Sequence, residues 1–190
     1  MVVLSDNWYT LRKATFEYLG SNGQWTTQNR EAYDRGNGAA ALLFDPDRRT
    51  IVLIRQFRLP AYINDGGDGM LIEAPAGLLD GDDPITAIRR EVEEETGYVV
   101  DDLQQIFDVF MSPGSVTERV VFFAGTYSAG QRSSVGGGHE AEGEDLDVIE
   151  IGLDDAAAMV ADGRIRDGKT IMLIQWAQLR EARTTRHPTS

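Results

Sequence analysis

Three glutamates that could bind a metal ion stand close together in one predicted helix. Glu91, Glu94 and Glu95 are spaced i, i+3 and i+4, so on a helix their carboxylates share one face. Like charges at this spacing destabilise a helix by roughly 0.2–0.5 kcal/mol per pair. A hard divalent cation such as Mg²⁺ makes the clustering of the carboxylates favourable, because it takes oxygen ligands in octahedral geometry. The cluster therefore indicates a cation site, with a solvated helix face as the alternative.

The helix that carries these glutamates is predicted over residues 84–96. Asp83 precedes it as an N-cap, Pro84 fits the first helical position, and Gly97 follows its end. A glycine-containing turn comes before the helix, where backbone can approach a metal or a phosphate closely. Arg90 stands beside the first glutamate and can pair with and orient the carboxylates.

The other predicted elements indicate an α/β fold with a mixed sheet. Alternating polar and apolar residues predict strands in the first 35 residues, with a hairpin turn at residues 20–23. Further strands are predicted at 39–44, 50–56, 71–74, 103–111, 118–127 and 147–151, and further helices at 154–162 and 169–182. Residues 62–70 and 128–145 read as loops. We expect an N-terminal strand region (1–37), a main domain (38–183) and a disordered tail (184–190).

Composition and charge exclude several function classes. The chain has 190 residues, 42% of them hydrophobic, which suits one compact domain. It has no apolar stretch of about 18 residues and no secretory signal pattern, so neither a membrane span nor export is expected. The absence of cysteine excludes disulfides and thiolate metal sites and fits a reducing cytoplasm. With only His139 and His187, a histidine-based zinc site or triad is not expected.

The net charge of −13 argues against nucleic-acid or membrane-surface partners, because such a field repels polyanions. A phosphorylated substrate would need metal ions or local arginines to compensate this charge.

The stretch from Gly77 to Tyr98 resembles the signature of the Nudix hydrolases. That signature reads Gly, five residues, Glu, seven residues, then Arg-Glu-apolar-x-Glu-Glu-x-Gly-apolar. Residues 90–98 match its second half in full, whereas Asp83 replaces the first Glu and only six residues separate it from Arg90. The resemblance implies the Nudix α/β/α sandwich, a mixed sheet between helices, with an N-terminal antiparallel hairpin.

Four further segments resemble a Nudix subgroup that hydrolyses GDP-mannose: 30–38, 52–58, 111–114 with 117–118, and 165–170. This resemblance implies cleavage of the pyrophosphate bond of a nucleoside diphosphate sugar, giving GMP and mannose 1-phosphate. Mg²⁺ is the implied cofactor, with Mn²⁺ as a possible substitute, in a homodimer that exchanges the N-terminal hairpin. The alternatives are an ADP-ribose or ADP-sugar pyrophosphatase and a catalytically inactive nucleotide-binding module. An RNA-binding member fits the acidic charge poorly.

The resemblance implies that Glu91, Glu95 and the backbone carbonyl of Ala76 bind the metal. Glu94 is either a third metal ligand or the carboxylate that positions Arg90.

A carboxylate from the glycine-rich loop 136–145 is expected to complete the site as ligand or general base. Glu144 is preferred because Glu-Asp-apolar directly precedes a strand, and Glu142 is the alternative. Glu140 is expected to be an ordinary solvated residue.

The remaining implied contacts are to the substrate. From the same chain these are Arg58, Ala76, Gly77, Leu78, Glu95, Glu118 and Lys169. From the partner subunit they are Trp8, Asn29, Arg30 and Glu31. The family carries tyrosine and lysine where this chain has Trp8 and Asn29, so a charge is lost at a position that bears on base preference. The alternatives are a surface arginine for Arg58, a surface lysine for Lys169, and sheet packing for Trp8.

Overall fold

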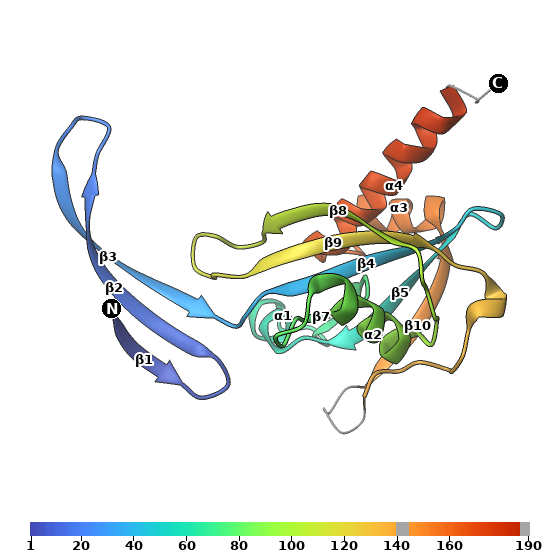
Figure 1. Cartoon of the computed structure of the whole chain (residues 1–190), viewed down its shortest axis with the longest axis horizontal. Coiled ribbons are helices and arrows are strands. Elements are labelled where there is room, and N and C mark those ends of the chain that lie inside the picture. The colour runs from blue at the N-terminus through green and yellow to red at the C-terminus, as the bar shows by residue number, and fades with distance from the viewer. Residues whose placement is uncertain (140–144, 187–190) are drawn as a thin grey trace.

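A computed structural model describes residues 1–139 and 145–186 and contains two sheets (Figure 1). The small sheet has the order β1-β2-β3, and the seven-stranded sheet has the order β10-β5-β4-β9-β8, with β6 on β5 and β7 on β4. The strands are β1 (Val2–Asp6), β2 (Thr10–Leu19), β3 (Trp25–Asp34), β4 (Gly38–Asp45), β5 (Thr50–Phe57), β6 (Met70–Glu73), β7 (Ala76–Leu78), β8 (Leu103–Phe110), β9 (Arg119–Thr126) and β10 (Leu146–Gly152). The helices are α1 (Leu59–Asp65), α2 (Pro84–Thr96), α3 (Leu153–Ala161) and α4 (Gly168–Arg186).

The large sheet is mixed, as predicted. Strands β4 and β9 pair in parallel from Gly38↔Val120 to Phe44↔Thr126, and the other pairs of this sheet are antiparallel. A parallel pair requires a long crossover, and the chain between β4 and β9 supplies it with α2 on one face. The mixed α/β class expected from the sequence is therefore confirmed.

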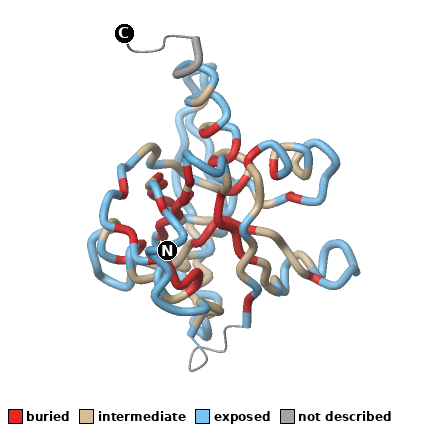
Figure 2. Tube along the Cα trace, turned by 90° about the vertical axis from the view of Figure 1, so that its right-hand side faces the viewer, coloured by how far each residue is buried: buried red, intermediate tan, exposed pale blue. Residues whose placement is uncertain are grey.

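Side chains of the central strands alternate between two cores. In β4, Leu42 packs in the core under α3 and α4, whereas Leu43 packs in the core under α2. In β9, Phe122 packs in the core under α3 and α4, and Phe123 packs in the core under α2. Successive strand residues point to opposite faces, so a run of apolar residues fills both layers of the sandwich. The buried residues accordingly concentrate in the middle of the molecule (Figure 2).

Helix α2 has the boundaries that the sequence predicts. The Asp83 carboxylate accepts a hydrogen bond from the Thr86 N–H at 3.2 Å and caps the N-terminus. Gly97 ends the helix in the left-handed conformation, with φ 76°. Ile88 and Val92 are fully buried against the sheet, so other faces of the helix are left for the acidic residues.

The N-terminal sheet stands beside the larger one (Figure 1). The predicted hairpin is confirmed by β2 and β3, which pair from Thr10↔Asp34 to Leu19↔Trp25, and β1 adds a third strand. Two backbone hydrogen bonds tie β3 to the loop before β9: Tyr33 N–H to the Ser115 carbonyl and Thr117 N–H to the Tyr33 carbonyl.

Two elements differ from the sequence prediction. Helix α1 lies in a stretch for which the sequence predicts no helix, and it ends at Asp65, inside the predicted loop, with Gly66 as its C-cap. None of its seven residues is buried, and the helix is too short for an apolar periodicity, which is read over about 11–18 residues, to stand out. Helix α4 continues to Arg186, beyond the expected end at 182, because no glycine or proline interrupts the chain before Pro188.

Among the described residues, every helix is too short or too polar to cross a bilayer.

Candidate active site

The backbone of β7 lies beside the acidic face of α2. Strand β7 pairs with the start of β4, at Ala39↔Gly77 and Ala40↔Ala76. The Ala76 N–H donates a hydrogen bond to Oε2 of Glu95 at 3.0 Å. The Glu95 side chain is only 1% exposed, so its carboxylate is fixed against the strand rather than solvated. The structure thus brings together Ala76 and Glu95, two of the predicted metal ligands.

Gly77 makes room for the third predicted ligand. A Cβ built on Gly77 would overlap the carboxylate of Glu91, whose side chain is 12% exposed. Glycine is required here because the carboxylate occupies the space of a side chain. The Ala76–Gly77 backbone and two carboxylates therefore meet between β7 and α2.

Arg90 contacts two of the clustered glutamates. Its Nη1 atom lies 3.1 Å from Oε1 of Glu91 and 3.6 Å from Oε2 of Glu94. Both Arg90 and Glu94 are about one-third exposed, at 38% and 34%. A guanidinium between two carboxylates reduces their repulsion and orients them. This is the contact expected if Glu94 positions Arg90.

The donor set fits a divalent cation. In residues 1–139 and 145–186, no three acidic or histidine side chains converge closely enough to hold a metal alone. Mg²⁺ does not require such a cage, because it binds through one or two carboxylates and keeps positions for water and substrate phosphates. Glu91, Glu95 and the Ala76 carbonyl provide hard oxygen ligands of this kind. The gap at Gly77, which the Glu91 carboxylate fills, supports that fit.

A buried ion-pair network that the sequence did not reveal lies next to this cluster. Glu73, at the end of β6, is 2% exposed and accepts hydrogen bonds from Nε and Nη2 of Arg58 at 2.8 and 2.9 Å. Nζ of Lys169 lies 3.4 Å from the same carboxylate and 2.7 Å from Oδ1 of Asp167. One signal in the sequence could have indicated this network: Glu73 is the single charged residue in the apolar strand 71–74. A charged residue in such a strand is rarely buried without a partner.

The charges around Glu73 determine its ionisation. Burial acts to raise the pKa of Glu73, but hydrogen bonds from Arg58 and the charge of Lys169 outweigh it and hold the pKa below its usual value. For Arg58, burial acts to lower the pKa, and the Glu73 carboxylate more than reverses that effect. The charged forms of Glu73 and Arg58 are therefore favoured, and Glu95 is close enough to raise the pKa of Arg58 further.

Thr170 connects this network to the backbone that leads into the site. Its hydroxyl accepts a hydrogen bond from the Ala74 N–H at 2.6 Å and donates to Oδ2 of Asp167 at 2.7 Å. Thr170 is fully buried. Since Ala74 is two residues before Ala76, α4 helps to fix the strand that carries the predicted carbonyl ligand.

Glu118 and Leu78 border the site on the side of the N-terminal sheet. Oε1 of Glu118 lies 3.5 Å from Nε of Arg35, whose guanidinium carbon lies 5.6 Å from the centroid of the Tyr9 ring. A cavity of about 360 Å³ opens between Arg35 and the turn that follows Leu78. This cavity is large enough for part of a small-molecule substrate.

The N-terminal candidates are exposed. Trp8 is 83% exposed, and Asn29, Arg30 and Glu31 all lie on exposed positions of β3. Figure 1 shows their sheet projecting away from α2, so the fold of one chain does not bring these residues to its own carboxylate cluster.

The chain before residue 140 is anchored on the C-terminal end of α2. The Gly137 N–H donates to the Glu95 carbonyl at 2.9 Å, and the Gly138 N–H donates to the Glu94 carbonyl at 3.2 Å. Gly136 has φ 68°, and a Cβ there would press on the backbone of Glu95 and Thr96. The expected loop carboxylates Glu142 and Glu144, and Glu140, lie outside the described residues.

The mixed sheet between helices and helix α2, which carries the signature glutamates, define a Nudix-type hydrolase, and comparison with known families agrees. The family model described as NUDIX domain matches residues 34–174. The model described as GDP-mannose pyrophosphatase NudK N-terminal domain matches residues 2–33. The chain belongs to the NUDIX family.

Curated relatives named GDP-mannose pyrophosphatase are similar to nearly the whole chain. The protein of Yersinia enterocolitica is 52% identical over 93% of this chain and 92% of its own length. The proteins of Yersinia pestis and Klebsiella pneumoniae are 53% and 49% identical, each over 93% of this chain and 88% of their own length. Both the N-terminal sheet and the large sheet are therefore included in the similarity.

Proposed function

We propose that this protein hydrolyses GDP-mannose to GMP and mannose 1-phosphate with Mg²⁺ as cofactor and Mn²⁺ as a possible substitute. Water supplies the oxygen that forms a bond to one phosphorus while the bridging P–O bond of the diphosphate breaks. The observation that carries the proposal is the meeting of Glu91, Glu95 and the Ala76–Gly77 backbone in a chain whose relatives bear that name. When bound, the cation neutralises the diphosphate and activates water for attack on phosphorus.

The residues around the cluster have distinct tasks in this proposal. Glu91, Glu95 and the Ala76 carbonyl hold the cation, and Arg90 with Glu94 orients the ligand carboxylates. A carboxylate at Glu144, or alternatively Glu142, takes the proton from the attacking water.

Substrate binding is assigned to groups that border the cluster. Glu73 holds the Arg58 guanidinium in place, so its exposed part can contact a phosphate. Lys169, fixed by the same carboxylate, adds positive charge, and Glu118 can accept hydrogen bonds from hydroxyl groups of the nucleotide or sugar. Gly77 and Leu78 offer backbone and apolar contact beside the adjoining cavity.

Three glutamine variants test the role of the carboxylates. Glu91→Gln and Glu95→Gln each remove a negative charge at nearly constant volume and should lower kcat/KM for GDP-mannose by at least about a hundredfold. Glu93→Gln is the matched control, because Glu93 lies on the same helix and is exposed. Mn²⁺ binding, followed by electron paramagnetic resonance, should weaken in the first two variants only. Intact turnover in Glu91→Gln and Glu95→Gln would refute the proposal.

Hydrolysis in ¹⁸O-labelled water identifies the substrate and the phosphorus together. GDP-mannose and ADP-ribose are supplied in parallel, and the products are analysed by mass spectrometry. The proposal expects faster turnover of GDP-mannose, with label in either GMP or mannose 1-phosphate according to the phosphorus attacked. Faster turnover of ADP-ribose would instead assign an ADP-sugar pyrophosphatase, and no turnover of either would favour a nucleotide-binding module.

We further propose a homodimer in which residues 1–37 act as a unit that reaches the partner's site. The N-terminal sheet exposes large aromatic side chains, Trp8 at 83%, Trp25 at 65% and Tyr18 at 52%, and such a surface is typical of an interface. In this arrangement Trp8 and the segment Asn29–Arg30–Glu31 contact the nucleotide bound by the other subunit.

Subunit mixing tests the shared site. Glu91→Gln and the double variant Trp8→Ala/Arg30→Ala should each have little activity alone. After unfolding and refolding together in equal amounts, random pairing should restore about a quarter of wild-type activity, because half the dimers contain one site with both intact parts. A mixture that is no more active than its components would place both groups in one chain's site.

A further inference from the structure

A cavity far from the carboxylate cluster lies between α4 and the sheet. It has a volume of about 310 Å³, and its floor is formed by Leu42 and Phe44 of β4 and Ala124 of β9. Leu42 points to the face covered by α3 and α4, whereas α2 covers the opposite face. The cavity, called the Trp176 cavity below, is therefore separated from the proposed active site by the thickness of the sheet.

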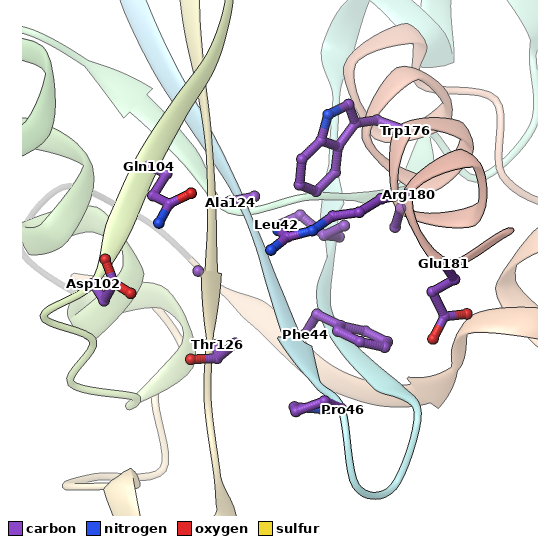
Figure 3. Close-up of a pocket in the computed structure, with 12 residues that line it drawn as sticks. Leu42, Phe44, Pro46, Asp102, Gln104, Ala124, Thr126, Trp176, Arg180 and Glu181 are labelled. Carbon is purple, nitrogen blue, oxygen red and sulfur yellow. The ribbon is translucent and has the colours of Figure 1, made fainter. Parts of the chain in front are cut away.

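One wall of the Trp176 cavity comes from α4. Figure 3 shows Trp176 and Arg180 pointing from this helix into the space above the floor. The guanidinium carbon of Arg180 lies 5.3 Å from the centroid of the Trp176 ring. The guanidinium lies over the indole ring, and this pair stands above an apolar floor, where a planar ligand can pack against it.

The opposite wall is polar and comes from the start of β8. Gln104 and, just before the strand, Asp102 face Arg180 across the cavity (Figure 3). Glu181, at the rim, forms an ion pair at 2.9 Å with Arg49. The lining thus combines donors and acceptors, and with Glu181 paired to Arg49 its remaining charged groups, Arg180 and Asp102, are of opposite sign.

This charge balance selects against ionic ligands. A phosphate near Arg180 would also meet Asp102 and the field of a chain with net charge −13. An ammonium group would meet the Arg180 guanidinium. A neutral molecule with both donors and acceptors on its edge avoids both repulsions.

The volume limits the ligand's size. Small-molecule sites range from about 300 to 1,000 Å³, so this cavity accommodates one fused ring system with a small substituent rather than a whole nucleotide sugar. We propose that the Trp176 cavity binds a neutral, planar heteroaromatic molecule of the size of a purine nucleobase or nucleoside. Its ring lies against Trp176 above Leu42, and its polar edge meets Arg180 and Gln104.

Equilibrium dialysis with guanosine tests this proposal on the whole protein, with EDTA present so that no hydrolysis occurs. Guanosine should bind saturably, and an excess of GDP-mannose should not displace it. GMP should bind to the cavity at least about tenfold more weakly, because of its phosphate.

Three variants locate the binding. Trp176→Ala removes the stacking surface and should weaken guanosine binding roughly ten- to a hundredfold. Ala124→Leu places a larger side chain in the space above the cavity floor and should weaken guanosine binding to a similar extent. Leu179→Ala is the matched control on α4, since Leu179 is 62% exposed and does not line the cavity. Thermal unfolding checks that each variant is folded, and GDP-mannose hydrolysis with Mg²⁺ is followed separately.

Several results would overturn the inference. These are the absence of saturable binding at millimolar guanosine, binding that both cavity variants leave unchanged, and competitive displacement by GDP-mannose. Equal affinity for guanosine and GMP would refute the preference for neutral ligands. Because the readout is binding under metal-free conditions, the inference stands or fails independently of the proposed hydrolysis.

Discussion

The carboxylate of Glu91 lies in the space where a side chain at position 77 would begin. Gly77, which opens the Nudix signature, and Glu91, the first glutamate of α2, are thus complementary in shape. Because β7 pairs with β4 in fixed register, the backbone at position 77 cannot move away without breaking strand hydrogen bonds. The glycine sets how closely the helix can approach the strand.

Gly77→Ala should therefore damage the site without unfolding the protein. The added methyl group displaces the Glu91 carboxylate, and a shift of about 1 Å at a reacting centre costs on the order of a hundredfold in rate. We expect such a loss in kcat/KM, together with a higher Mg²⁺ concentration for half-maximal activity. Gly67→Ala, where a Cβ meets open space, is the control and should leave kcat/KM and the Mg²⁺ dependence unchanged. An unchanged Mg²⁺ dependence in Gly77→Ala would show that Glu91 does not need its present position.

Gly136→Ala should weaken the attachment of the following loop to α2. The left-handed φ of 68° and the contact with the backbone of Glu95 both disfavour a side chain, so we expect about 1–2 kcal/mol of destabilisation. The hydrogen bonds of Gly137 and Gly138 to the end of α2 should loosen with it. Hydrogen exchange of these two amides measures the effect directly.

Gly130→Ala is the matched control for that experiment, because Gly130 lies in the same segment and a Cβ there meets nothing within 4 Å. If both variants gave the same exchange rates as the wild type, the glycine would have no anchoring role.

Local signals explain what the sequence revealed. Helix α2 was predictable because its cap, its first proline and its terminal glycine are all encoded within a few residues. The α/β class followed from apolar runs such as 39–44 and 51–54, which supply both faces of a central strand.

The network around Glu73 was not predictable, because its partners are remote in sequence. Arg58 is 15 residues away and Lys169 is 96 residues away, and only the folded sheet brings them together. The family resemblance indicates Arg58 and Lys169 as substrate contacts, and that role stays a prediction. Helix α1 was not predictable for a different reason: with seven residues, none of them buried, it is too short for a periodic pattern to be read.

The cap of α2 allows a stability test that is independent of catalysis. Asp83→Ala removes the hydrogen bond to the Thr86 N–H and should destabilise the protein by about 1 kcal/mol. For a chain of this size, that corresponds to a fall in Tm of roughly 2–4 °C. Asp82→Ala, at the neighbouring exposed position, should change Tm much less. Equal Tm values for the two variants would mean that the cap contributes nothing.

Replacing Glu73 should change the pH dependence of stability. The pKa of this carboxyl in the folded protein is below the ordinary value of 4.5, so its charged form stabilises the fold above that pH. This contribution is lost as the pH falls through the lowered pKa. In the wild type, the free energy of unfolding should fall with pH below pH 4.5 partly because of Glu73. Glu73→Gln should make this decline less steep, by up to about 1.4 kcal/mol per pH unit.

At neutral pH the same variant should lose about 1–3 kcal/mol of stability, because Arg58 and Lys169 lose their shared partner. Asp147→Asn is the matched control: its ion pair with Arg55 spans 3.7 Å and is solvent-exposed, so little change is expected. Urea unfolding of all three proteins between pH 3 and 7 provides the comparison. If the free energy of unfolding fell as steeply below pH 4.5 in Glu73→Gln as in the wild type, the loss of stability in acid would be assigned to other carboxylates.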